Sequence, residues 1–259
     1  MPEGDVVWNT AQRLHAALAG QVLTRSDFRV PRYATVNLTG QAVTEAVARG
    51  KHLLIRTDRT LTVHTHLKMD GYWRIQPSGR SSLGRSHQVR LVLGNTRWLA
   101  AGYLLGITEV LPTAREDQVV GHLGPDLLGP DWDPAAAVAR LARTPDRPIG
   151  EALLDQRNLA GLGTVYLAET LFLRGVAPSR PVGSVDDLET LVDLAHRLLD
   201  ANKTRLGHVT TGDTSPGREN WVYGRAGRPC RRCATPINRG EAGPAGQERL
   251  RFWCPNCQR

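Results

Sequence analysis

The spacing of apolar and polar residues divides the chain into a helical start, a strand-rich stretch and a helical second half. Residues 6–18 carry apolar side chains at helical spacing, and Gly20 supplies a stop. These apolar positions are Val7, Ala11, Leu14 and Leu18. From about residue 21 to 111, short apolar or alternating runs are separated by turn residues. The clearest runs are 22–23, 53–55, 61–63, 72–75 and 89–93. The pattern predicts an amphipathic helix followed by a β-sandwich.

The second half of the chain is predicted to be helical. A connector rich in Pro, Asp and Gly runs from Pro112 to Pro134, and helical periodicity continues to about residue 205. One helix is expected after Asp133, an N-cap residue, with Pro134 at its first position. Another is expected to start at Ser184, with Asp187 as its capping-box partner. Its buried face would comprise Leu188, Leu191, Leu194, Ala195 and Leu198.

Two glycines, Gly161 and Gly163, lie directly before a further expected helix. Glycine lets the backbone approach a ligand closely, and the free N–H groups of a helix N-terminus bind phosphate well. Close packing of two helices is the alternative explanation of this Gly-x-Gly. Its occurrence in a basic chain favours the phosphate interpretation.

The four cysteines form one motif near the C-terminus. Cys230-x-x-Cys233 and Cys254-x-x-Cys257 have the spacing of a four-thiolate zinc ribbon, in which two knuckles complete a tetrahedron around one structural Zn²⁺. Between them, a turn at 239–244 predicts a β-hairpin. Four thiolates leave no open coordination position, so the metal is not expected to be catalytic. Six arginines lie around the cysteines and predict contact with phosphate: Arg225, Arg228, Arg231, Arg232, Arg249 and Arg251.

These boundaries predict a multi-domain α+β protein with four segments. Residues 1–111 form a β-sandwich with an N-terminal helix, 112–133 a connector, 134–222 a helical domain and 223–259 a four-cysteine finger. The length of 259 residues accommodates two modest domains.

An excess of positive charge predicts a polyanionic partner. The net charge is +8 and the pI is about 9.8, which favours nucleic acid. No apolar run approaches 18 residues and no lysine-rich amphipathic face is evident, so a membrane partner is not expected. Glu3 and Asp5 stand where a secretory signal needs basic residues. We expect a cytoplasmic, nucleoid-associated monomer with no small-molecule cofactor.

The first residues carry candidate chemistry. Removal of Met1 would leave Pro2 with a free secondary amine, and an α-amino group titrates near ~7.7–8.0, so part of it is unprotonated and nucleophilic at neutral pH. Glu3 offers a carboxylic acid next to it. The pair suits Schiff-base chemistry on an aldehyde-type carbon such as C1′ of a ring-opened deoxyribose. A frayed terminus is the alternative.

Taken in order along the chain, several motifs resemble the formamidopyrimidine-DNA glycosylase/endonuclease VIII family. They are Pro2-Glu3-Gly4, Gly50-Lys51-His52-Leu53, His66-Leu67-Lys68-Met69-Asp70-Gly71, Leu154-Asp155-Gln156, Gly161-Leu162-Gly163-Thr164-Val165-Tyr166, and Tyr223-Gly224-Arg225-Ala226-Gly227 before the cysteines. Each motif alone is ordinary, but their joint order is specific.

The resemblance implies a DNA repair enzyme with a β-sandwich, a helix-two-turn-helix domain and a zinc finger, with DNA between the two lobes. Pro2 would attack C1′ of the damaged nucleotide, Glu3 would act as acid and base on the sugar, and Lys51 would assist glycosidic cleavage. Arg249 and His66 would contact phosphates. The resulting iminium permits β- and δ-elimination, after the damaged base has been extruded from the stack.

Three positions depart from the family pattern. Thr164 replaces the usual asparagine of the Gly-x-Gly-Asn motif, and Val6 stands where a glutamate is usual. The stretch 101–106 has no arginine or phenylalanine, which leaves Met69 as the evident wedge for the gap left by a flipped base. We therefore expect an endonuclease VIII-like enzyme that removes oxidised pyrimidines and favours single-stranded or forked DNA. An 8-oxoguanine-type glycosylase and a non-catalytic sensor of DNA damage are the alternatives.

Overall fold

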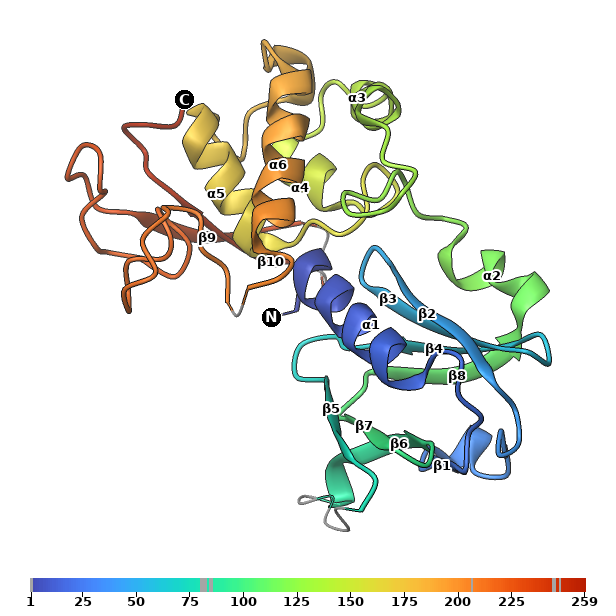
Figure 1. Cartoon of the computed structure of the whole chain (residues 1–259). Helices are drawn as coiled ribbons and strands as arrows, with labels where there is room; N and C mark the ends of the chain where they lie inside the picture. The colour runs from blue at the N-terminus through green and yellow to red at the C-terminus, as the bar shows by residue number, and fades with distance from the viewer. Residues whose placement is uncertain (1, 80–82, 84–85, 206, 244–245, 247) are drawn as a thin grey trace. The chain divides into compact units, whose positions relative to one another are not determined.

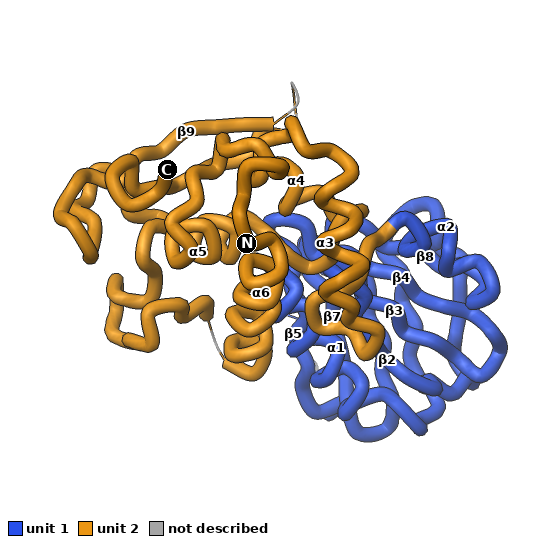
Figure 2. Tube along the Cα trace, turned by 90° about the horizontal axis from the view of Figure 1, so that it is seen from above, with its two compact units in different colours: residues 1–122 blue, residues 123–259 orange. Residues whose placement is uncertain are grey.

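The structure is a computed structural model that describes residues 2–79, 83, 86–205, 207–243, 246 and 248–259. Its contacts divide the chain into two units, residues 1–122 and 123–259 (Figure 2). The boundary falls inside the segment predicted as a connector. No helix in the described part of the chain is long and apolar enough to span a membrane.

Two four-stranded antiparallel sheets form a β-sandwich in the first unit (Figure 1). One sheet has the order β1-β6-β7-β5 and the other β2-β3-β4-β8. Their strands are β1 (Arg25–Phe28), β2 (Val43–Arg49), β3 (His52–Thr57), β4 (Leu61–His66), β5 (Tyr72–Pro77), β6 (Val89–Gly94), β7 (Trp98–Tyr103) and β8 (Ile107–Pro112). The predicted sandwich is confirmed. The pair Val22-Leu23 is outside the strands, because Val22 forms only an isolated bridge to Ala42.

The N-terminal helix α1 (Gly4–Leu18) packs on this sandwich. The four apolar positions predicted from helical spacing are all buried, and they join Leu53, Ile55 and Val63 in one core. Burial of each such side chain contributes on the order of 1.5–3 kcal/mol, so this stripe fixes the helix against the sheet. Short helical turns complete the unit: η1 (Pro31–Tyr33), η2 (Ser86–Gln88), η3 (Thr113–Arg115) and α2 (Asp117–Val120).

The second unit is mainly helical. Its helices are α3 (Pro134–Ala142), α4 (Ile149–Leu154), α5 (Thr164–Arg174), η4 (Val182–Ser184) and α6 (Leu188–Asn202). Helix α3 begins as predicted, since the Asp133 side chain accepts the Ala136 N–H at 3.0 Å. Helix α6 begins after Asp187, not at Ser184, because Asp187 itself accepts the Thr190 N–H at 2.9 Å.

Helix α6 buries a slightly different face from the predicted one. Leu194 is half-exposed and lies outside the core, whereas Val192 and Leu199 are fully buried in it. Helix α5 is buried from Thr164 to Phe172 and ends at Gly175, which has φ +70°. A helix that is buried on all sides over most of its length fits a position at the centre of a unit.

A two-stranded ribbon of β9 (Asn238–Ala242) and β10 (Arg249–Trp253) lies near the C-terminus. The hairpin is as predicted, but its turn comes later than residues 239–244, because Gly240 pairs with Arg251 inside the ladder. Pro244 of the predicted turn is outside the described residues. Phe252 packs with Phe172 and Ala168, so the ribbon is anchored on α5.

Candidate active site

The two residues before α1, Pro2 and Glu3, differ in their exposure to solvent. Pro2 is half-buried, whereas Glu3 is fully buried and stands at the N-cap, its carbonyl accepting the Val7 N–H at 3.1 Å. Met1 is outside the described residues. The role of Pro2 and Glu3 in catalysis remains a prediction.

Lys51 is carried by the tight turn between β2 and β3. Arg49 and His52 are the last paired residues, so Gly50 and Lys51 alone form the loop. Gly50 has φ +56°, the left-handed region that glycine adopts without strain. A two-residue hairpin with glycine at its first position is typical of a type II′ turn. The glycine therefore sets the direction in which Lys51 leaves the sheet.

Helix α1 runs antiparallel to β2 and brings its first turn toward Lys51. The Ala46 N–H donates to His15 Nδ1 at 3.3 Å, and Ala19 bridges Val43. A helix rises about 1.5 Å and a strand about 3.3 Å per residue, so the path from His15 back to Gly4 and the path from Ala46 on to Lys51 each cover about 16 Å. Pro2 and Glu3 are therefore expected at the level of the β2–β3 turn.

His66, at the end of β4, lies within electrostatic reach of Lys51. Burial first, and then the charges of Lys68, Lys51 and His64 in that order, lower the pKa of His66 to about 4. His66 Nδ1 accepts the Lys68 N–H at 2.9 Å. The neutral ring consequently keeps its proton on Nε2, as a hydrogen-bond donor.

The predicted wedge, Met69, is 53% exposed and therefore is not a core residue. It lines a hollow of about 360 Å³ together with Leu104, Arg90 and five other residues. Only Leu104, Leu105 and Gly106 connect β7 to β8, and Leu104 has φ +48°. Gly71 is required here, because an added Cβ would lie 2.5 Å from the Leu67 carbonyl oxygen. Leu104 was not identified from the sequence.

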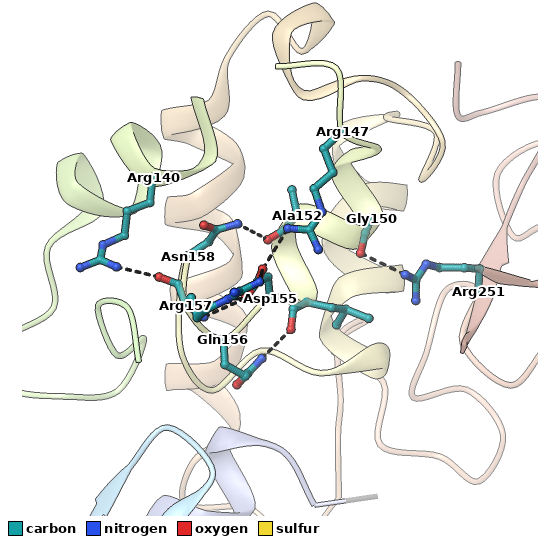
Figure 3. Close-up of polar contacts among 10 residues, drawn as sticks. Arg140, Arg147, Gly150, Ala152, Asp155, Gln156, Arg157, Asn158 and Arg251 are labelled. Carbon is teal, nitrogen blue, oxygen red and sulfur yellow. Dashed lines mark hydrogen bonds and ion pairs between the residues drawn. The ribbon is translucent and has the colours of Figure 1, made fainter. Parts of the chain in front are cut away.

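In the second unit, the Gln156 side chain, which is labelled in Figure 3, holds the turn before α5. Gln156 Oε1 accepts the Gly161 N–H at 3.0 Å, and Gln156 Nε2 donates to the carbonyls of Leu154 and Leu162 at 2.9 and 3.0 Å. Gly161 has φ +100°, and Gly163 is the extended N-cap of α5. Thr164 is only 4% exposed at the first helical position. The role of Gly163 and Thr164 in phosphate binding remains a prediction.

Asp155 fixes the same turn through two arginines. Arg157 donates from Nε and Nη2 at 2.9 and 2.7 Å, and Arg147 donates from Nη1 at 2.9 Å (Figure 3). These hydrogen bonds, first those of Arg157 and then that of Arg147, hold the pKa of Asp155 well below its usual range. Asp155 is thus ionised at neutral pH, and the side chain of Arg157 is 70% exposed beside it.

The arginines around the cysteines are not all available to phosphate. Arg249 is exposed at the start of β10. Arg251 is 5% exposed and donates to the Gly150 carbonyl at 3.2 Å (Figure 3). Arg225 is also buried, and it donates to the carbonyls of Trp221 and Pro229. The guanidinium groups of Arg225 and Arg251 thus bind backbone carbonyls of the fold, and phosphate contact by the finger remains a prediction.

The four cysteines gather as the sequence predicts. The sulfurs of Cys230, Cys233, Cys254 and Cys257 all lie within 4.8 Å of one another. Zn–S bonds of about 2.3 Å place tetrahedral sulfurs roughly 3.8 Å apart. The Cys230–Cys257 and Cys233–Cys254 pairs, at 3.9 and 3.4 Å, are close to this. The cluster can hold a metal ion.

Three comparisons with known proteins agree with this geometry. Residues 1–101 match the N-terminal domain of formamidopyrimidine-DNA glycosylase, and residues 123–204 match its H2TH domain. The chain is 55% identical to probable endonuclease 8 2 of Streptomyces coelicolor over all of this chain and 94% of the relative. It is 50% identical to the DNA-(apurinic or apyrimidinic site) lyase Nei2 of Mycolicibacterium smegmatis over all of this chain and 99% of the relative.

The fold is similar to that of Lactococcus lactis formamidopyrimidine-DNA glycosylase in a crystal structure with DNA containing an AP site. The TM-score is 0.82, with 99% of each chain covered and 23% identity. The two matched domains, the four-cysteine cluster and the identity to full-length relatives establish the relationship. The chain belongs to the formamidopyrimidine-DNA glycosylase/endonuclease 8 family, whose members are DNA glycosylases with AP lyase activity.

Proposed function

We propose that this protein is a bifunctional DNA glycosylase and AP lyase of base excision repair, and that it removes oxidised pyrimidines through a Schiff base. The antiparallel packing of α1 on β2 carries the proposal, because the rises of a helix and a strand lead us to expect Pro2 and the buried Glu3 at the level of the turn that presents Lys51. An amine nucleophile, a carboxylic acid and a lysine are the groups that this chemistry needs. The names of the relatives at 50–55% identity support the same activity.

The proposed reaction begins with the unprotonated secondary amine of Pro2. Its lone pair attacks C1′ of the extruded nucleotide, the bond to the base breaks, and the base leaves with a proton. Lys51 assists this departure, and Glu3 protonates the ring oxygen of the sugar so that the ring opens to an iminium. Loss of a C2′ proton then expels the 3′ phosphate, and loss of a C4′ proton expels the 5′ phosphate. Hydrolysis of the iminium frees Pro2.

Other residues are proposed to hold damaged DNA. In the second unit, Arg249 and the N-terminus of α5 at Gly163 and Thr164 would bind phosphates. In the first unit, His66 would donate to a phosphate from Nε2, and Met69 would fill the space left by the extruded base. Zinc fits the four-cysteine set, and its chemistry there is structural, because it cross-links the ribbon without an open coordination position.

The short connection between β7 and β8 favours a preference for DNA that is already unpaired. Met69 and Leu104 are aliphatic, and no arginine stands in the Leu104–Gly106 connection to hydrogen-bond the orphaned base. Holding a duplex open costs a few kcal/mol, and this cost is least for single-stranded substrates. We propose action on single-stranded, bubble or forked DNA of the nucleoid, by a monomer.

Borohydride trapping tests the proposal. The protein, with its native N-terminus, is incubated with abasic oligonucleotides and reduced. We expect a covalent adduct in which mass spectrometry finds the sugar on Pro2, and we expect an N-terminal tag that converts the Pro2 nitrogen into an amide to abolish the adduct while DNA binding persists. Absence of an adduct with the unmodified protein refutes the lyase and favours a damage-binding protein.

Lesion and strand preference are tested separately. Rates of 5-hydroxyuracil and 8-oxoguanine excision are measured in matched single- and double-stranded oligonucleotides. We expect faster removal of 5-hydroxyuracil, and at least equal rates in single strands. Faster removal of 8-oxoguanine supports the alternative glycosylase, and a large advantage of duplex DNA contradicts the strand preference.

A further inference from the structure

Behind Lys51, a carboxylate and two imidazole rings are joined in a row across three strands. Glu109 on β8 lies directly opposite His64 on β4, and His64 Nδ1 is 2.6 Å from Glu109 Oε1. His64 Nε2 is in turn 2.7 Å from Nδ1 of His52, the first residue of β3. We refer to Glu109, His64 and His52 as the triad. It lies entirely within the first unit.

The geometry shows that the two rings meet edge to edge. Their planes differ by 18° and their centroids are 5.0 Å apart, nearly twice the distance between the bonded nitrogens. Rings lying face to face would have their centroids much closer. The residues belong to the face of the sheet opposite the Leu53 and Ile55 side chains, which are in the core. His64 is only 1% exposed.

When both rings are neutral, the hydrogen bonds determine which nitrogen of each ring carries the proton. A carboxylate only accepts, so His64 donates from Nδ1 to Glu109. His64 Nε2 therefore has a free lone pair and accepts from His52 Nδ1. The Nε2 of His52 is then a hydrogen-bond acceptor. The hydrogen bond from His52 Nδ1 to His64 Nε2 sets the orientation of the His52 ring. A glutamate two strands away from β3 thus fixes one defined state of His52.

His52 remains neutral in this environment. Burial lowers the pKa of His52 to about 3, and the charges of His66, His64, His122 and Lys68 contribute in that order. His66 lies directly opposite His52, with the rings edge to face at 4.9 Å, and the His122 ring is 6.2 Å away. A neutral ring next to Lys51 adds no repulsion to an ammonium group there.

We infer that the triad of Glu109, His64 and His52 is a positioning device for Lys51 in the base-release step. The inference rests on the role proposed above for Lys51. His52 directly follows Lys51, and the loop between the paired residues Arg49 and His52 has only two residues. A fixed His52 side chain leaves this loop little freedom to rotate. An aliphatic side chain at position 64 would fill the sheet equally well but would not orient His52.

Two reactions of the same protein separate positioning from general structural support. Base release from a 5-hydroxyuracil oligonucleotide requires Lys51, whereas cleavage at a preformed abasic site requires Pro2 without base departure. We expect His64→Leu and Glu109→Ala to slow single-turnover base release on the order of tenfold, as misplacement of a catalytic group does. Cleavage at the abasic site should stay within about twofold of the unmodified protein, since this step does not use the misplaced group.

The conservative and control variants sharpen the test. Glu109→Gln keeps an oxygen that accepts from His64 Nδ1, so it should restore most of the base-release rate. Glu45→Gln loses an ion pair with Arg56 on the same sheet, 2.6 Å in length, and should leave both rates unchanged. Circular dichroism shows whether His64→Leu folds. If it does not, Glu109→Ala alone provides the test, because removal of a partly exposed side chain should not prevent folding.

A double-mutant cycle gives the decisive outcome. Lys51→Ala combined with His64→Leu should be no slower in base release than Lys51→Ala alone, because the triad then has nothing to position. Additive losses, or equal losses in both reactions, would overturn the inference. A failure of the unmodified protein to form the reduced adduct is a different result, which contradicts the proposed function itself.

Discussion

Gln156 accepts a hydrogen bond from the backbone N–H of Gly161 at 3.0 Å, so that one side chain spans the turn before α5. The other end of the same amide donates to two carbonyls. Both polar ends of a half-buried side chain are therefore used to define the N-terminus of a buried helix.

Gln156→Ala should destabilise the protein and weaken its binding to DNA. The substitution leaves backbone groups of the turn without partners, which costs about 1–3 kcal/mol for a buried group. Urea unfolding gives the change in the free energy of unfolding, and fluorescence anisotropy gives the affinity for abasic DNA. Gln118→Ala, on the exposed part of α2, is the control and should change neither. Equal behaviour of the two variants would show that the amide is dispensable.

Gly50→Ala should disturb the Lys51 turn. Because Gly50 has φ +56°, a Cβ at this position costs about 1–2 kcal/mol, and relief of this strain would rotate the loop. We expect slower base release with less effect on cleavage of abasic sites. Gly79→Ala is a matched control, since nothing lies within 4 Å of an added Cβ there and its φ is not positive. Unchanged kinetics in Gly50→Ala would contradict the type II′ assignment.

The half-buried residues His52 and His66 predict a loss of stability in mild acid. His52 and His66 have pKa values of about 3 and about 4 in the folded protein, below the ordinary value of 6.5. The unfolded chain therefore binds more protons, and stability falls as pH decreases below about 6.5, by about 1.4 kcal/mol per pH unit for each histidine. His66→Gln should make this decline shallower. Urea midpoints between pH 7 and 5 measure it, and an identical slope in the variant would refute it.

Removal of the metal should disable the ribbon and spare the first unit. The four clustered cysteines flank β9 and β10 and would hold the metal ion, and Phe252 and Cys254 pack with residues of α5. Elemental analysis should give one zinc ion per chain, and a chelator should abolish tight DNA binding while the β-sheet signal persists. Cys254→Ser is expected to have the same effect, because it removes one of the four ligands. Full DNA affinity without metal would contradict this role.

Elements with local signals could be predicted from the sequence. The apolar stripe of α1, the Asp133–Pro134 start of α3 and the paired CxxC motifs each lie within a short segment, and all three are confirmed. The start of α6 was misplaced because Ser184 and Asp187 both resemble caps. Only the structure shows that Ser184 belongs to the preceding turn η4 and that Asp187 accepts the N–H of Thr190.

Relationships between distant segments could not be predicted. His64 and His66 are two positions apart in β4, so their side chains lie on the same face of the sheet. The residues that they contact depend on how β3 and β8 are aligned with β4. Arg251 and Arg249 look equivalent in the sequence, and only the position of the Gly150 carbonyl distinguishes the buried one from the exposed one. The roles of Pro2, Glu3, Lys51 and Arg249 are still predictions, since they concern chemistry with a substrate.

The antiparallel packing of α1 on β2 sets a constraint on how this chain can change in length. Three helical turns cover about the same distance as five residues of strand, so Pro2 and Lys51 are expected at a common level only with both segments at their present lengths. An insertion in either segment would separate them by several ångströms. An insertion or deletion in α1 must therefore be matched by one in β2 that restores the common level. Substitutions on the outer surface of α1 do not have this restriction.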